Sequence, residues 1–257
     1  MEIVIVSIVA FLTALLTFFS GFGLGTLLAP VLMLFFPIDV AIALTGIVHF
    51  FNNMFKLVLV GKNVNKDVFL RFGIPAILFA FIGAFVLLQI PNMQPLFSYQ
   101  FIGKTFSIYP LKLTIAILIL FFALMDILPY FSKLQFDKNK LPIGGALSGF
   151  FGGLAGTQGA LRSAFLIRAG LSKEAFIGTT VVISSLVDFT RLSVYATRMM
   201  HLDLKENLPL LIYATLSAMT GAFIGNKLLK KVTINFLKFT VATFLILIGI
   251  ALGLGWI

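Results

Sequence analysis

The chain has 257 residues, of which 60% are hydrophobic and 11% charged, and its formal net charge is +10. With a mean hydropathy of +1.10 it is more apolar than a soluble protein, which indicates a polytopic membrane protein. The positive charges lie in short gaps between apolar stretches. This pattern indicates topology signals of a membrane protein and not a nucleic-acid-binding patch. Because cysteine is missing, disulfides, thiolate metal sites and cysteine nucleophiles are excluded.

The first apolar stretch, residues 3–36, carries no charged residue and is too long for one straight crossing of a bilayer core about 30 Å thick. It must fold back or break. The predicted break is Ser20-Gly21-Phe22-Gly23-Leu24-Gly25-Thr26, which contains three glycines. Pro30 suits the first turns of a short second helix, and we expect Asp39 to cap the helix after it.

Six further stretches have the length and apolarity of membrane spans, at about residues 40–60, 68–90, 111–131, 173–197, 208–229 and 236–257. The longest connection, 91–109, is polar and aromatic and is expected to be a loop.

A second Gly-rich stretch, residues 141–170, holds seven glycines in its first twenty residues and has Thr157, Gln158 and Arg162 at its middle. An arginine at this depth suggests an interrupted helix that lines a polar cavity. The alternative is a small-residue packing face, because glycines recur every four residues from Gly145.

The second half of the chain repeats the first. The matching segments are Ser20-Gly21-Phe22 with Ser148-Gly149-Phe150, Gly25-Thr26 with Gly156-Thr157, and Gly83-Ala84-Phe85 with Gly221-Ala222-Phe223. Internal similarity with paired interrupted segments is typical of transporters built from two repeats. We therefore predict an all-α polytopic membrane protein in which residues 1–131 and 132–257 form two inverted repeats. Each repeat would be a Gly-rich broken or re-entrant helix unit followed by three transmembrane helices.

Basic residues predict the orientation. If each Gly-rich unit returns to the side that it left, one face receives most of the lysines and arginines of the chain. That larger set is Lys62, Lys66, Arg71, Lys133, Lys138, Lys140, Arg168, Lys173, Lys227, Lys230 and Lys231. The positive-inside rule places it in the cytoplasm and both termini outside. Single crossings by the Gly-rich units would move Lys227, Lys230 and Lys231 outside, which fits the rule less well.

Polar residues recur in the first span after each Gly-rich unit, at steps of four, four and three residues that define one helical face. The two stripes are Thr45, His49, Asn53 and Lys56, and Thr180, Ser184, Asp188 and Arg191. A cation inside a membrane needs a partner or a watery cavity, so Lys56 and Arg191 are functional candidates. Two alternatives stay open: Lys56 snorkels to the surface, and Arg191 merely pairs with Asp188.

Short helices that begin after Gly-rich breaks direct their N-termini, with free N–H groups, toward the membrane centre, which favours a small anion. The predicted binding residues are Gly25, Thr26, Asn53, Gly156, Thr157, Gln158, Arg162 and Arg191. Coupling or orienting roles are assigned to His49, Lys56, Ser184 and Asp188, of which Asp188 either orients Arg191 or carries a proton. No metal site is expected, because the chain has only two histidines.

The Gly-rich segments, Pro30, the stretches Ala41 to Thr45 and Ala175 to Thr180, and the loop Gly61 to Asn65 resemble the sulfite exporter TauE/SafE family of membrane transporters. The resemblance covers nearly the whole chain. The family pattern usually has denser glycine, as Gly-x-Gly-Gly-Gly, where this chain has Gly23-Leu24-Gly25-Thr26 and Gly156-Thr157-Gln158-Gly159. The resemblance to this family implies transport of sulfite, an organosulfonate or another small anion across a bacterial cytoplasmic membrane.

We therefore expect the protein to be a transporter and not an enzyme. It would export its substrate by alternating access between the repeats. An anion channel is the main alternative. An intramembrane enzyme is a weaker one, because its only nucleophile candidates are Ser184 or Ser185 with Asp188. The expected partners are a small anionic substrate and the lipid bilayer, without a cofactor or nucleic acid, and association into a homo-oligomer is compatible with the sequence.

Overall fold

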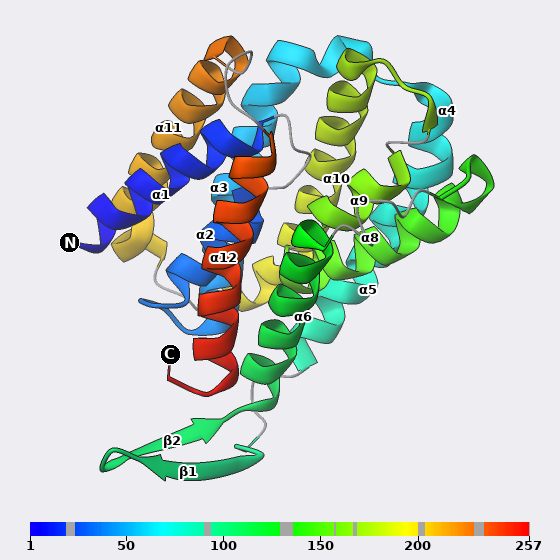
Figure 1. Cartoon of the computed structure of the whole chain (residues 1–257). Helices are drawn as coiled ribbons and strands as arrows, with labels where there is room; N and C mark the ends of the chain where they lie inside the picture. Colours follow the sequence, from blue (N-terminus) through cyan, green and yellow to red (C-terminus); the bar gives the residue numbers. More distant parts are fainter. Residues whose placement is uncertain are drawn as a thin grey trace.

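The computed structural model describes residues 1–18, 24–89, 94–128, 136–156, 158–166, 169–199, 204–228 and 234–256, and most of them are helical (Figure 1). The first half contains α1 (Glu2–Thr17), α2 (Leu24–Leu32), α3 (Ile38–Val60), the 3-10 turn η1 (Gly61–Asn63), α4 (Lys66–Val68), the π-helical turn η2 (Phe69–Gly73), α5 (Ile74–Gln89), β1 (Phe97–Phe101), β2 (Lys104–Ile108) and α6 (Pro110–Ile127). The second half contains the 3-10 turn η3 (Lys138–Lys140), α8 (Leu141–Ala155), α9 (Gly159–Leu166), α10 (Lys173–Met199), α11 (Leu204–Leu228) and α12 (Ile234–Gly253).

Helix length and composition fit a bilayer. Within the described residues four helical stretches are long and apolar enough to cross a membrane, at Ile38–Asn63, Lys66–Gln89, Lys173–Ala196 and Asn207–Lys227. Shorter apolar helices lie at Glu2–Thr17, Pro110–Met125 and Ala242–Gly253. Large apolar side chains such as Leu78, Phe81 and Leu247 are exposed on the surface, as they are where lipid replaces water.

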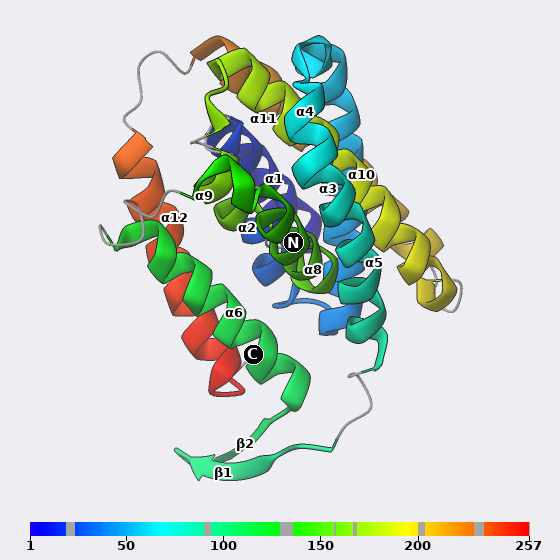
Figure 2. The ribbon, with the colours of Figure 1, turned by 90° about the vertical axis from the view of Figure 1, so that its right-hand side faces the viewer.

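Each of the main helix pairs joins the first half of the chain to the second. Helix α1 packs along α11, α5 along α8, α3 along α10, and α6 along α12 (Figures 1 and 2). The two halves are therefore interlocked, and the contacts between α3 and α10 bring the two polar stripes of the sequence together.

Glycines let α5 and α8 approach closely. A Cβ atom on three α8 glycines would lie 2.0 to 2.1 Å from a backbone carbonyl oxygen, at Gly145 against Phe72 of η2 and at Gly149 and Gly153 against Ala76 and Ala80 of α5. Helix α1 meets α11 in the same way, since a Cβ on Gly221 would lie 2.2 Å from the Phe11 carbonyl oxygen. The packing-face interpretation is thus correct for the α8 glycines, whose lack of a side chain is needed for backbone contact.

The second Gly-rich unit is an interrupted helix, as the sequence predicts, whereas residues 20–23 of the predicted break in the first unit lie outside the described residues. Helix α8 runs without a break through Ser148-Gly149-Phe150 and ends at Gly156, which has a left-handed φ of +73°. The segment matched to Ser148-Gly149-Phe150 in the first half, Ser20-Gly21-Phe22, lies outside the described residues. Two further close contacts resemble each other: Gly83 of α5 approaches the Phe150 carbonyl oxygen of α8, and Gly221 of α11 approaches the Phe11 carbonyl oxygen of α1.

Two local expectations also change. Helix α3 begins at Ile38 with Pro37 at the N-cap position, so Asp39 lies in the first turn and is not the N-cap residue. The expected loop 91–109 contains an antiparallel hairpin of β1 and β2, whose turn residues Ile102 and Gly103 have φ of 48° and 72°. The Tyr99 hydroxyl donates a 2.7 Å hydrogen bond to the Leu254 carbonyl oxygen, which fastens the hairpin to the C-terminal end of α12 (Figure 1).

Candidate functional site

The polar stripes of α3 and α10 face each other inside the molecule. All eight residues of these stripes are buried, with exposed fractions between 0% and 7%. The stripes are Thr45, His49, Asn53 and Lys56, and Thr180, Ser184, Asp188 and Arg191. Since the remaining residues of both helices are mostly apolar, the lipid-facing sides take the apolar residues and the facing sides take the polar ones.

Asp188 is the centre of this polar contact. Its Oδ2 atom lies 2.6 Å from His49 Nδ1 and accepts a 2.9 Å hydrogen bond from Asn53 Nδ2. Its Oδ1 atom accepts a 3.0 Å hydrogen bond from Arg191 Nε and lies 2.8 Å from Arg191 Nη2. Three side chains from two helices therefore satisfy one buried carboxylate, which holds the facing edge of the guanidinium in a fixed orientation.

The other edge of the Arg191 guanidinium reaches the point where the two Gly-rich units meet. A Cβ on Gly156 would lie 2.7 Å from Arg191 Nη1, and one on Gly25 would lie 3.2 Å from the Gly156 carbonyl oxygen. A Cβ on Gly46 of α3 would lie 3.5 Å from the Cζ atom of Arg191, so α3 also approaches the guanidinium at a glycine. Arg191 is 0% exposed, and its Nη1 has no hydrogen-bond partner among the described residues. A buried N–H group left in this state is costly unless an acceptor binds there.

The short helices α2 and α9 begin next to this junction. Gly25 lies in the first turn of α2, and α9 starts at Gly159 after the left-handed turn at Gly156. Gln158, just before α9, is 0% exposed, and neither polar atom of its amide has a partner within the described part of the chain. Thr157 and the Thr26 side chain lie outside what the structure describes. The described part of the junction thus offers helix N-termini and polar groups with free bonding capacity.

Electrostatics at the site favour an anion. The buried charged side chains in the described ranges are the cations Lys56, Arg162 and Arg191 and the carboxylate of Asp188. Lys56 is 5% exposed and its Nζ lies 5.3 Å from the centroid of the Phe18 ring, so its charge does not reach the surface and the snorkelling interpretation is wrong. One carboxylate against three cations leaves positive charge in a low-dielectric region, where an anion is stabilised.

Two residues of the site are missing from the sequence prediction. Asn52 is 0% exposed, and neither of its amide atoms has a partner in the described ranges. Its position, three residues after His49 and four before Lys56, places it on the polar face and was a usable signal. Tyr195 follows Arg191 by one turn and donates a hydrogen bond to the carbonyl oxygen of Gly153, which ties α10 to the end of α8.

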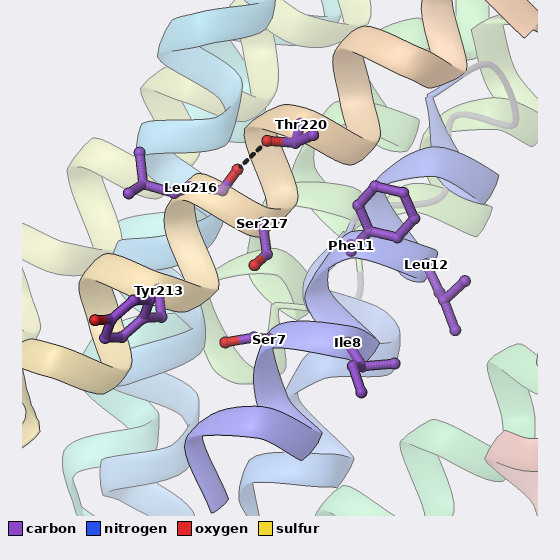
Figure 3. Close-up of a pocket in the computed structure, with 8 residues that line it drawn as sticks. All are labelled: Ser7, Ile8, Phe11, Leu12, Tyr213, Leu216, Ser217 and Thr220. Carbon is purple, nitrogen blue, oxygen red and sulfur yellow. Dashed lines mark hydrogen bonds between the residues drawn. The ribbon is translucent and has the colours of Figure 1, made fainter.

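The structure also contains a surface groove that does not belong to this site. It has a volume of about 600 Å³ and lies between α1 and α11 (Figure 3). The lining residues are Ser7, Ile8, Phe11, Leu12, Tyr213, Leu216, Ser217 and Thr220. None of them is charged, so the groove does not supply what an anion needs. No group of three His, Cys, Asp or Glu side chains that could hold a metal ion occurs in the described part of the chain.

A protein-family model described as Sulfite exporter TauE/SafE matches residues 6–252 of the chain. No match was found among curated proteins.

Proposed function

Since the chain belongs to the sulfite exporter TauE/SafE family, we propose that it exports a small anion, such as sulfite or an organosulfonate, by alternating access between two inverted repeats. Proteins of this family are multi-pass membrane transporters and not enzymes. For this chain, we infer the specific substrate and the transport mechanism from the geometry of the site.

The observation that carries the proposal is the position of Arg191. Its Nε and Nη2 atoms are held by Asp188, while Nη1 points to the Gly25 and Gly156 junction without a partner in the described residues. An anion that leaves water must regain its hydrogen bonds, and a guanidinium together with helix N-termini supplies strong charge-assisted ones.

We propose that the anion binds at this junction, near the membrane midplane. Backbone N–H groups at Gly25 and Thr26 and at Gly156, Thr157 and Gln158 would contact it, together with the side chains of Asn53, Arg162 and Arg191. The amide nitrogen of Asn53 already donates to Asp188, so its second N–H is the one available to the anion. Lys56 adds positive charge nearby, but its ammonium is a point charge without the planar fork that Arg191 offers.

Exchange of helix partners between the halves supports the inverted repeats. Helix α1 packs on α11 as α8 packs on α5, and the remaining pairs, α3 with α10 and α6 with α12, join helices at equivalent places in the two halves. An axis that exchanges the halves would produce this pattern. With the larger basic set in the cytoplasm, both termini would lie outside the cytoplasmic membrane.

Transport assays test the proposal. Purified protein in liposomes should take up labelled sulfite, sulfoacetate or thiosulfate, with saturation and with counterflow when the unlabelled anion is inside. Arg191→Gln protein should lose this flux, whereas Lys56→Gln should retain part of it. Linear, unsaturable flux without counterflow would identify a channel, and no flux of any of the three anions would overturn the proposed substrate class.

A further inference from the structure

We propose that His49 is a proton-binding site linked to the anion site, so that one proton binds together with the anion and crosses the membrane with it in the same direction. The inference rests on the proposed function and adds to it a coupling ion and the residue that binds it. The geometry behind it is the unbroken chain of contacts from His49 through Asp188 to Arg191.

The contact between His49 and Asp188 assigns roles to the two ring nitrogens. Nδ1 lies 2.6 Å from Oδ2 of Asp188, which is itself fixed by Arg191 on its other oxygen. An ionised carboxylate only accepts, so Nδ1 must carry a hydrogen and donate it. Asn53 Nδ2, 3.3 Å from Nδ1, is also a donor and finds its acceptor in Asp188 at 2.9 Å. The nitrogen left to gain or lose a proton is therefore Nε2.

His49 is the group of this network best placed to carry that proton. Asp188 accepts from three donors through both oxygens, and protonation of the carboxyl would give up one of these contacts. Arg191 has a guanidinium, which keeps its proton in proteins. Protonation of Nε2 leaves the Nδ1 contact in place and makes it a charge-assisted one.

The charges around His49 give the sign of the coupling. The charged groups that act on it are Asp188 and Arg191 from α10 and Lys56 from its own helix. Among the other elements that pack against α3, α2 has no titratable residue, η1 has one exposed lysine, and α11 has its charged residues near its ends and an exposed tyrosine. The positive charges of Lys56 and Arg191 thus disfavour the protonated form of His49, and the carboxylate of Asp188 favours it.

An anion bound beside Arg191 offsets this opposition. It adds negative charge next to the cations, so it raises the affinity of His49 for a proton. By thermodynamic reciprocity, a protonated His49 raises the affinity for the anion by the same factor, which for coupled sites is typically about 5- to 150-fold. Positive coupling between the two ligands means that they are carried together, as in symport, and not in exchange.

The test measures proton movement in liposomes that contain a pH-sensitive dye, with labelled sulfoacetate as the anion because it does not titrate near neutral pH. An imposed sulfoacetate gradient should move protons in the direction of the anion. His49→Asn, whose amide can still donate to Asp188, should keep counterflow of sulfoacetate but lose proton movement. It should also lose the pH dependence of the apparent affinity. If His49→Asn does not purify as a folded protein, His49→Gln is used in its place. His201→Asn, which changes the only other histidine of the sequence, should behave as wild type.

Three results would overturn the inference: wild-type anion flux without proton movement, protons that move against the anion, or a His49 variant that moves protons as wild type does. In each of them anion transport persists, so the proposed function survives. Absence of flux of every tested anion in the wild type overturns the proposed function and this inference with it.

Discussion

Replacement of Gly156 by alanine separates the binding geometry at the junction from backbone strain. Gly156 has a φ of +73°, and a Cβ there would lie 2.7 Å from Arg191 Nη1. Gly103 is a matched control, because its φ is +72° and nothing lies within 4 Å of its Cβ position in the β1–β2 turn. Both substitutions introduce the same backbone strain, which costs about 1–2 kcal/mol for a residue with a side chain in the left-handed region. Only Gly156→Ala displaces the guanidinium.

The size of the additional effect follows from the contacts of Arg191. Nε and Nη2 are tied to Asp188, so the guanidinium cannot yield without breaking these contacts or withdrawing Nη1 from the junction. Loss of one charge-assisted hydrogen bond to the anion costs about 1.5–3 kcal/mol, which corresponds to roughly 10- to 150-fold weaker binding.

Counterflow at several anion concentrations and a thermal unfolding curve measure the two effects. We expect Gly156→Ala to lose at least as much stability as Gly103→Ala, because it also disturbs Arg191, and only Gly156→Ala to show the weaker affinity. Equal affinity in the two variants would refute the argument that the anion site depends on the position of Nη1.

Three further predictions follow from the packing and the topology. Arg191→Lys should weaken anion binding at least about tenfold, because a lysine lacks the planar fork of the guanidinium. Arg191→Gln should abolish counterflow yet elute as folded protein, since Asp188 keeps two other hydrogen-bond donors. Normal counterflow by the Gln variant would contradict the assigned site. Gly149→Leu should destabilise the protein by about 3 kcal/mol or more, because its Cβ would start 2.0 Å from an α5 carbonyl oxygen, and an unchanged unfolding temperature would show that α5 and α8 can separate. Single cysteines at Asn63 and Asn139 should resist an impermeant maleimide in intact cells and react after permeabilisation, and their labelling from outside would reverse the proposed orientation.

The polar stripes were predictable because a helix converts sequence spacing directly into a face. Steps of three and four residues in an apolar span leave few alternatives, and all eight stripe residues are buried between α3 and α10. Asn52 lies on the same face, but its counterpart at the spacing of 135 residues that relates the two stripes is the apolar Val187, so the pairing of the stripes does not indicate it. The contact of Arg191 with Gly156 connects two helices that meet only in the folded chain, so spacing alone does not contain it.

The separate roles of the glycines and the presence of the hairpin are harder to predict from sequence, for a physical reason. Glycine serves two purposes in this chain, close helix contact at Gly149 and a left-handed turn at Gly156, and sequence similarity does not distinguish them. The β1–β2 turn is formed by Ile102 and Gly103, and isoleucine is unusual where φ is positive, so the Asn-Gly or Asp-Gly signal of a two-residue turn is missing.

The backbone contacts of the glycines have a mechanical consequence. Helices that touch through carbonyl oxygens, as α8 does on α5 at Gly149 and Gly153, have no side chains between them to rearrange. We therefore expect each such pair of helices to move as one rigid body. The same holds for α1 and α11 at Gly221. The rigid bodies of a transport cycle would then each contain one helix from either half of the chain. A hinge between these bodies would lie where the contacts run through side chains, as they do between α3 and α10 around Asp188, and there the polar network would have to open and close.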